Sequence, residues 1–331
     1  MHLPIWLVLA LALLLPFLLA ASALAAPCLT AGPECTEWVN LGSGSSRSLI
    51  YRTFPLTEKN ASITRAMVMV HGAGRDADNY FRTSLAAAFL AGALQDTIVI
   101  SPRYASNNGQ GCKDKLADNE VNWSCNGDSW RSGGTSITDK SLTSYDLMDD
   151  ILKQLADKKV FPNLKEIVLA GHSAGGQFVT RYEMANLVHD KLGVPVKYVV
   201  ANPSSYAYLD SSRPTTEPIK CATYDNWPYG LKNRGGYTDR LTDEQLKKQI
   251  AARPVTYLLG EIDILPLGGF DGSCPAMAEG PTRLARGQAF GKYINEKYGA
   301  RHEIKEVHLC GHNARCMFTA EEALPLIFPK Q

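Results

Sequence analysis

Gly171-His172-Ser173-Ala174-Gly175 is a G-x-S-x-G motif, and the residues before it, Ile167-Val168-Leu169-Ala170, are all apolar. The apolar run predicts a buried strand, and the residues from Ala174 onward predict a helix. A G-x-S-x-G motif between a strand and a helix is typical of a strained turn that exposes the serine hydroxyl. Such a turn needs glycine on both sides, because a side chain there would collide with the strand or the helix. Ser173 is therefore the candidate nucleophile.

Short apolar stretches alternate with amphipathic stretches around this motif, from Ser48 onward. The alternation predicts an α/β fold, in which helices cover a central sheet. Apolar residues at helical spacing predict one helix near Leu147 and Ile151 and another near Phe178 and Tyr182. The predicted strands are residues 49–54, 66–70, 97–101, 167–170, 197–201, 255–259 and 304–309.

The composition is that of a folded protein of 331 residues, of which 45% are hydrophobic and 20% charged. These values exclude a disordered or low-complexity chain. The net charge of +1 gives no sequence-wide positive field, so we do not expect nucleic-acid binding. The chain has no linker rich in proline, serine or glycine. We therefore expect residues 26–331 to form a single domain.

Two long stretches of this expected domain fit neither a strand nor a helix pattern. Residues 103–140 are rich in asparagine, glycine, serine and aspartate, whereas residues 203–250 carry aromatic residues between prolines and glycines. Long irregular excursions inside a compact domain are usually functional. We expect residues 103–140 to form an irregular rim, and residues 203–250 to form a cap-like insertion at a site.

Residues 1–25 have the pattern of an export signal. Residues 3–20 are almost wholly apolar, and Ala23-Leu24-Ala25 is a small-x-small cleavage signal. Cleavage would begin the mature chain at Ala26 and leave a secreted protein, extracellular or periplasmic, with no stable membrane insertion. An uncleaved anchor helix is the alternative, because the apolar stretch is just long enough to span a bilayer and no positive residue precedes it.

All eight cysteines follow this cleavage site, and an even number of cysteines in an oxidising compartment indicates four disulfides. Short loops close most easily, which favours pairs between neighbours in the sequence. The expected pairs are Cys28 with Cys35, Cys112 with Cys125, Cys221 with Cys274, and Cys310 with Cys316.

The turn His71-Gly72-Ala73-Gly74 comes directly after the predicted strand 66–70. Two glycines let the chain turn sharply, so backbone N–H groups there can face a developing oxyanion. We expect the N–H groups of Ala73 and Ala174 to form the oxyanion hole, with Gly74 as the alternative to Ala73. His71 is expected to be a buried, hydrogen-bonded imidazole with a structural role.

A general base needs a carboxylate to hold it, and the segment Gly260-Glu261-Ile262-Asp263 follows the predicted strand 255–259. Asp263 is the expected acid, because it lies far enough round the turn to reach a histidine on another loop. Glu261 and Asp271 remain the alternatives, since spacing alone does not assign a carboxylate.

The candidate general base is His312, in a Gly-His turn after the predicted strand 304–309. His308 would lie on that strand, so we expect its side chain to pack on a face of the sheet. His308, Cys310, His312 and Cys316 also resemble a metal cluster, but cysteines of an exported protein are normally oxidised. The histidines expected to be surface or elbow residues without chemistry are His172, His189 and His302.

The order Ser173, Asp263, His312 is that of the α/β-hydrolases, and the sequence resembles this superfamily over nearly all of its mature length. Within it, the chain is similar to secreted esterases that include polyhydroxybutyrate depolymerase-like and feruloyl esterase-like proteins. They too combine a signal peptide, a His-Gly-x-Gly turn, a G-x-S-x-G-G elbow and disulfides. The resemblance implies a mostly parallel central sheet, no cofactor, and acyl transfer through a serine ester.

The expected activity is therefore that of a secreted serine hydrolase that cleaves carboxylic esters. Export and the aromatic residues of 203–250 favour an extracellular ester with apolar or aromatic groups, such as a polyester or a plant-wall ester. A serine peptidase of the same fold is one alternative, because its nucleophile would be the same. A binding protein that keeps the hydrolase scaffold without turnover is the other.

Overall fold

The computed structural model describes residues 26–109, 111–215 and 218–329. The predicted export signal, residues 1–25, lies outside them. Among the described residues, no helix is long and apolar enough to cross a membrane.

An eight-stranded sheet forms the centre of the fold, in the order β1-β2-β4-β3-β5-β6-β7-β8. From β4 to β8 all neighbouring strands are parallel, whereas β1 and β2 are antiparallel additions at one edge. The mostly parallel α/β-hydrolase sheet predicted from the sequence is thus confirmed. The strands are β1 Thr36–Asn40, β2 Arg47–Arg52, β3 Arg65–Val70, β4 Thr97–Pro102, β5 Glu166–His172, β6 Val196–Ala201, β7 Val255–Gly260 and β8 Glu303–Val307.

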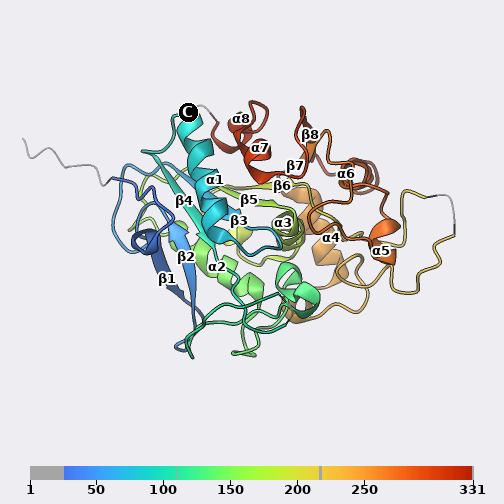
Figure 1. The fold of residues 1–331 in the computed structure, drawn as a ribbon, viewed down its shortest axis with the longest axis horizontal. Coiled ribbons are helices and arrows are strands. Elements are labelled where there is room, and N and C mark those ends of the chain that lie inside the picture. Colours follow the sequence, from blue (N-terminus) through green and yellow to red (C-terminus); the bar gives the residue numbers. More distant parts are fainter. Residues whose placement is uncertain (1–25, 110, 216–217, 330–331) are drawn as a thin grey trace, which may run out of the picture.

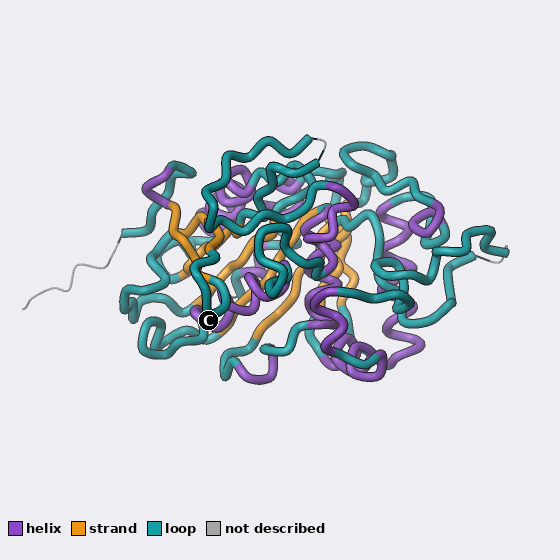
Figure 2. The backbone as a smooth tube through the Cα atoms, turned by 90° about the horizontal axis from the view of Figure 1, so that it is seen from below, coloured by secondary structure: helices purple, strands orange, loops and turns teal. Residues whose placement is uncertain are grey.

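Each face of the sheet packs against its own set of helices (Figure 1, Figure 2). Met67 and Met69 of β3 point to a core shared with α1 and α7, whereas Val68 and Val70 point to a core shared with α2, α3 and α6. This alternation follows from the two-residue period of a strand, and burial of both faces explains why the parallel strands are apolar throughout. The helices are α1 Ala77–Leu90, α2 Ser144–Leu155, α3 Ala174–Ala185, α4 Asp243–Ala252, α5 Cys274–Met277, α6 Arg283–Tyr298, α7 Ala314–Thr319 and α8 Leu324–Ile327.

The two predicted helices correspond to α2 and α3. Helix α2 begins with a capping box, in which Thr143 and Asp146 satisfy each other's backbone N–H groups, and it buries Leu147 and Ile151. Helix α3 is buried on every side, directly beneath the G-x-S-x-G turn. A helix buried all round is held by its neighbours, so the turn at its start stands on a rigid base.

The two long excursions differ in structure from each other and in part from expectation. Residues 103–140 contain only one short 3-10 helix, Asn126–Ser132, whereas residues 203–250 include the regular helix α4. The aromatic side chains of Tyr206 and Tyr208 are buried against Phe290 of α6. These two rings are part of the core, so they give no support to the expectation of an aromatic ester.

All eight cysteines form disulfides between nearest neighbours in the sequence, as predicted. Cys112–Cys125 closes a loop within residues 103–140, and Cys221–Cys274 joins residues 203–250 to the start of α5. Each excursion is therefore fastened covalently near its middle. Cys310–Cys316 encloses the turn that carries His312.

Candidate active site

Ser173 lies between the last residue of β5 and the first residue of α3. Its backbone has φ 58° and ψ −120°, a strained conformation for a residue with a side chain. A methyl group on Gly171 would overlap the Gly175 carbonyl, and one on Gly175 would overlap the Val70 carbonyl. Glycine at both positions allows strand, turn and helix to pack this closely.

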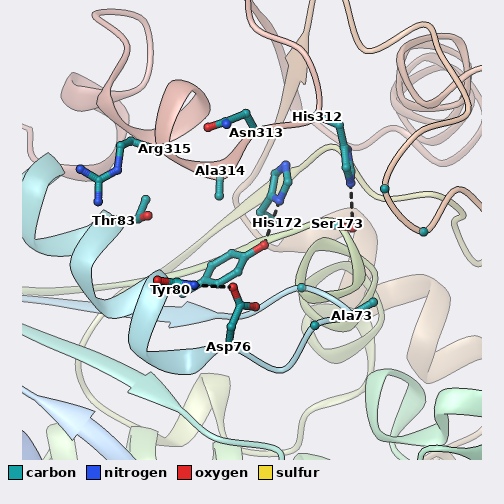
Figure 3. Close-up of a pocket in the computed structure, with 15 residues that line it drawn as sticks. Ala73, Asp76, Tyr80, Thr83, His172, Ser173, His312, Asn313, Ala314 and Arg315 are labelled. Atoms are coloured by element: carbon teal, nitrogen blue, oxygen red, sulfur yellow. Dashed lines mark hydrogen bonds between the residues drawn. The ribbon is translucent and has the colours of Figure 1, made fainter. Parts of the chain in front are cut away.

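Three predicted side chains meet at the carboxyl ends of the parallel strands, and Figure 3 shows two of them, Ser173 and His312. His312 Nε2 lies 2.9 Å from Ser173 Oγ, and His312 Nδ1 lies 2.8 Å from Asp263 Oδ2. Ser173 follows β5, Asp263 follows β7, and His312 lies between β8 and α7. Parallel strands bring their carboxyl ends to the same edge, which explains why residues so distant in sequence converge.

The hydrogen bonds define how this relay handles a proton. The Asp263 carboxylate accepts from Nδ1–H of His312, so Nε2 is left to accept the proton of the Ser173 hydroxyl. The side chains of Asp263 and His312 are only 2% and 11% exposed. A buried carboxylate beside an imidazole fixes the ring and favours its charged form during proton transfer.

The alternative carboxylates lie elsewhere. Glu261 is exposed; it accepts a hydrogen bond from the Leu309 backbone N–H and pairs with His308. Asp271 accepts from the Tyr229 hydroxyl at 2.8 Å. Neither bonds His312, so the geometry favours Asp263.

His308 does not pack on a face of the sheet, contrary to expectation. Strand β8 ends at Val307, and the chain then turns through Leu309, whose φ is 52°. The His308 side chain is 70% exposed and lies 2.8 Å from Glu261. The strand ends two residues earlier than predicted, and this places His308 in the turn.

The expectation for the other histidines is also wrong in part. His172 lies in the elbow, as expected, whereas His302 is buried rather than on the surface. His302 bonds the Tyr257 hydroxyl and the Ile250 carbonyl, inside the core. His172 contacts His312, with ring centroids 4.6 Å apart.

His71 is buried and has both ring nitrogens engaged. Its Nδ1 donates to the Gly72 carbonyl at 2.9 Å, and its Nε2 accepts from the Tyr104 backbone N–H at 3.1 Å. Burial lowers the pKa of His71 to about 4. The neutral ring thus fixes the start of the turn that carries Ala73.

The turn 72–74 borders the same cavity as Ser173. A methyl group placed on Gly72 would lie 3.7 Å from Ser173 Cβ, so the turn passes close to Ser173. Ala174 is the first residue of α3, and the first N–H groups of a helix have no intrahelical acceptor. Ala73 lines this cavity, and Ala174 follows Ser173 directly in the chain, so both N–H groups stay candidates for the oxyanion hole.

The cavity at this edge of the sheet has a volume of about 530 Å³. Its polar lining includes Asn79 and, as Figure 3 shows, Asp76, Thr83 and Arg315. None of the described residues of 203–250 lines it, so the expected cap does not reach this cavity. The complete lining is Gly72, Ala73, Gly74, Asp76, Asn79, Tyr80, Thr83, His172, Ser173, Gly268, Gly269, His312, Asn313, Ala314 and Arg315.

No pattern in the sequence pointed to Arg283, on α6. Its guanidinium donates to Asp263 Oδ1 at 3.3 Å, to Ser204 Oγ at 2.7 Å and to the carbonyls of Leu267 and Gly268. Gly268 in turn lies against the His312 ring. Arg283 therefore holds both the carboxylate and a loop that flanks the imidazole.

Asn202 is a second residue that the sequence analysis missed. It follows β6, accepts from the Gly260 N–H at 2.7 Å and donates to the Gly311 carbonyl at 3.2 Å. It thereby ties the end of β7 to the turn before His312. Its position directly after a predicted strand was a signal that could have identified it, because site residues gather at strand ends.

Cys310 and Cys316 are bonded to each other, so the cluster with His308 and His312 is not a set of free metal ligands. Across the described part of the chain, no group of three or more histidine, cysteine, aspartate or glutamate side chains could hold a metal ion.

Residues 67–315, well over half of the chain, match the alpha/beta hydrolase family. The chain belongs to this family. No curated protein sequence matches this alpha/beta hydrolase.

Two solved structures share the fold of this alpha/beta hydrolase. Poly(aspartic acid) hydrolase-1 from Sphingomonas sp. KT-1 is 20% identical with a TM-score of 0.61, and the match covers 88% of this chain and 98% of that one. The poly(3-hydroxybutyrate) depolymerase LpqC from Bordetella parapertussis is 20% identical with a TM-score of 0.62, and the match covers 88% and 90%. At this identity the likeness shows the fold alone.

Proposed function

We propose that this alpha/beta hydrolase cleaves carboxylic esters through an acyl-enzyme on Ser173. The observation that carries the proposal is the relay from Asp263 through His312 to Ser173, with bonds of 2.8 and 2.9 Å, at the wall of a cavity. A serine hydroxyl bonded to an imidazole that is itself held by a carboxylate is the arrangement that activates serine for acyl transfer.

In the first half-reaction, Ser173 Oγ attacks the ester carbonyl carbon while His312 Nε2 takes the hydroxyl proton. The N–H groups of Ala73 and Ala174 stabilise the oxyanion, each lowering the barrier by roughly 3 kcal/mol. The intermediate collapses when His312 returns the proton to the leaving alcohol. Water then attacks the acyl-enzyme, with His312 again as base, and releases the acid and free Ser173.

The cavity favours an ester that carries polar groups close to the scissile bond, because Asp76, Asn79 and Arg315 lie in its wall. A second cavity of about 330 Å³ shares Ala73 and Gly74 with it and extends toward Cys112 and Lys113. Two cavities that meet at the oxyanion turn suit an extended substrate with repeated units. The two structural relatives described above are named for polymer hydrolysis, one of a polyamide and one of a polyester, which supports a polymeric substrate.

We further propose that the enzyme acts outside the cytoplasm. Residues 1–25 have the pattern of a cleaved export signal. The four disulfides support the same location, because such bonds persist in oxidising compartments.

The test combines active-site labelling with a substrate panel. A fluorophosphonate should label the wild type but not Ser173→Ala, and this variant should lose turnover of p-nitrophenyl esters by about six orders of magnitude with an unchanged melting temperature. Ser141→Ala, on an exposed serine, is the matched control and should remain fully active. Faster cleavage of peptide anilides than of esters would favour a peptidase, and an unlabelled, inactive wild type would favour a binding protein.

A further inference from the structure

We propose that Tyr80 and His172 form a positioning pair, in which Tyr80 orients the His172 ring and this ring holds the His312 imidazole in register with Ser173. The inference rests on the proposed function, in which His312 is the base. Neither residue is assigned a part in the relay itself.

His172 is the residue just before Ser173, and its ring lies against the ring of His312. The two centroids are 4.6 Å apart and the planes are inclined by 37° (Figure 3). The His172 side chain is buried, and its Nδ1 lies 3.0 Å from the Tyr80 hydroxyl. The surface that supports His312 therefore comes from the same turn that presents Ser173.

The direction of the hydrogen bond follows from the groups around the Tyr80 hydroxyl. The Gly72 backbone also bonds this hydroxyl, and burial raises the pKa of Tyr80 well above its usual range. The phenol therefore keeps its proton and donates it to His172 Nδ1, which leaves the His172 proton on Nε2.

The pair keeps His172 uncharged beside the base. Burial holds the pKa of His172 well below its usual range, and the nearby His312 and Arg283 side chains act in the same direction. A neutral ring can contact His312 in both of its protonation states without repelling the imidazolium. Nε2 of His172 is buried and has no hydrogen-bond partner among the described atoms. A buried polar atom without a partner destabilises the fold, so we infer that His172 serves a purpose other than stabilising it.

Tyr80 also connects this pair to the oxyanion turn. A methyl group on Gly72 would lie 2.7 Å from the Tyr80 oxygen, so hydroxyl and turn are in close contact. One side chain on α1 thus contacts both the turn that carries Ala73 and the ring that supports His312. We expect a displacement of Tyr80 to disturb both catalytic elements while leaving the substrate cavity otherwise intact.

The chain offers a matched control for removing this hydrogen bond. Tyr257 and His302 form a second buried pair, with a distance of 2.9 Å between the hydroxyl and Nδ1, in the core beside Phe290. Tyr80→Phe and Tyr257→Phe remove the same type of bond. We expect the two variants to lower the melting temperature by similar amounts. Only Tyr80→Phe should lower kcat, by about tenfold, with KM changed less than twofold. The reason is that displacing a catalytic group by about 1 Å lowers the rate on the order of a hundredfold.

A double-mutant cycle tests whether Tyr80 acts through His172. His172→Phe keeps a ring against His312 but cannot accept from Tyr80, so adding Tyr80→Phe to it should lower kcat by less than twofold further. Equal kcat for Tyr80→Phe and Tyr257→Phe, or independent effects of Tyr80 and His172, would overturn the proposal. If Tyr80→Phe does not fold, the test is a comparison of His172→Phe with His172→Ala. A kcat that is retained only in His172→Phe supports the ring contact, and an equal kcat in both variants overturns it.

Fluorophosphonate labelling separates this inference from the proposed function. Labelling of Ser173 needs the base but no particular ester, and it should slow about tenfold in Tyr80→Phe. A wild type without ester turnover or labelling would contradict the proposed function itself. If Ser173→Ala abolishes both ester turnover and labelling while Tyr80→Phe lowers neither, only the positioning pair is contradicted.

Discussion

Arg283 lies 3.3 Å from the Asp263 carboxylate, on the oxygen that His312 does not use. Both side chains are buried, so the aspartate that faces the imidazole is also half of a buried ion pair. Removal of one partner from such a pair leaves an uncompensated charge and costs about 3–5 kcal/mol.

Arg283→Lys should therefore lower both stability and turnover. Lysine keeps the charge but cannot bond Asp263, Ser204 and two carbonyls at once. We expect kcat/KM to fall by about tenfold or more, because the loop at Gly268 loses its hold beside His312. Ester kinetics and urea unfolding measure the two effects.

Arg286→Lys is the control, since Arg286 is buried on the same helix and bonds backbone carbonyls but not Asp263. It should lose stability with little loss of kcat/KM. Equal losses of activity in the two variants would show that Arg283 has no special link to the acid.

The buried His71 predicts a loss of stability in mild acid. Its pKa is about 4 in the folded protein, against about 6.5 when unfolded, so between these values the unfolded chain binds the extra proton. The neutral His71 ring contributes about 3 kcal/mol to the free energy of unfolding above pH 6.5, and this contribution is lost as the pH falls toward 4. The buried Glu183 and Glu279, whose pKa values are raised to about 8, act in the opposite direction. The His71 contribution to the slope of stability against pH should therefore be read as the difference between wild type and His71→Gln in urea unfolding at pH 7 and 4.5.

His71→Gln should reduce that slope, because glutamine does not titrate but can still accept from the Tyr104 N–H. Part of the slope should remain, since the pKa of the buried His172 is also low. Between pH 7 and 8 both proteins should keep a constant difference in stability. An unchanged slope in the variant would rule out His71 as a source of the acid sensitivity.

Cys310–Cys316 should matter more for turnover than for stability. The disulfide closes a loop with a sequence separation of 6. Restricting the unfolded chain by so short a loop stabilises the folded protein by only about 2 kcal/mol. His312 lies inside this loop, so replacing both cysteines by serine should lower kcat on the order of a hundredfold.

Cys28–Cys35, with a sequence separation of 7 at the opposite edge of the sheet, is the matched control. Its double serine variant should show a similar decrease in melting temperature and an unchanged kcat. If both double variants lose turnover equally, the bridge at His312 acts only through global stability.

The sequence predicted what depends on local pattern. The G-x-S-x-G motif lies in the expected turn, and each of the seven predicted strands overlaps one of the sheet. Strand β1 was missed because it is a half-exposed edge strand, whose polar Glu37 and exposed Trp38 give no apolar run. Helix α4 was missed because only Leu246 and Ile250 of its residues are buried, too few to mark a face.

The parts of the site that the sequence did not reveal depend on contacts across the fold. Tyr80 and His172 are 92 residues apart, and Arg283 reaches Asp263 from a different helix. A tyrosine on one helix and an arginine on another are common residues in common places. Only the folded arrangement distinguishes them from ordinary surface or core positions.

Among the residues that the structure describes, β8 pairs with β7 alone, and its other side is an edge at which a strand of another molecule could pair. Glu303, Lys305 and Glu306 place charges along this edge, which opposes such pairing even though Ile304 is partly exposed. The same edge leads into the turn that carries His312. Mutations that neutralise these charges to adsorb the protein on an apolar support would therefore promote fibrillar association at the side of the molecule that carries His312.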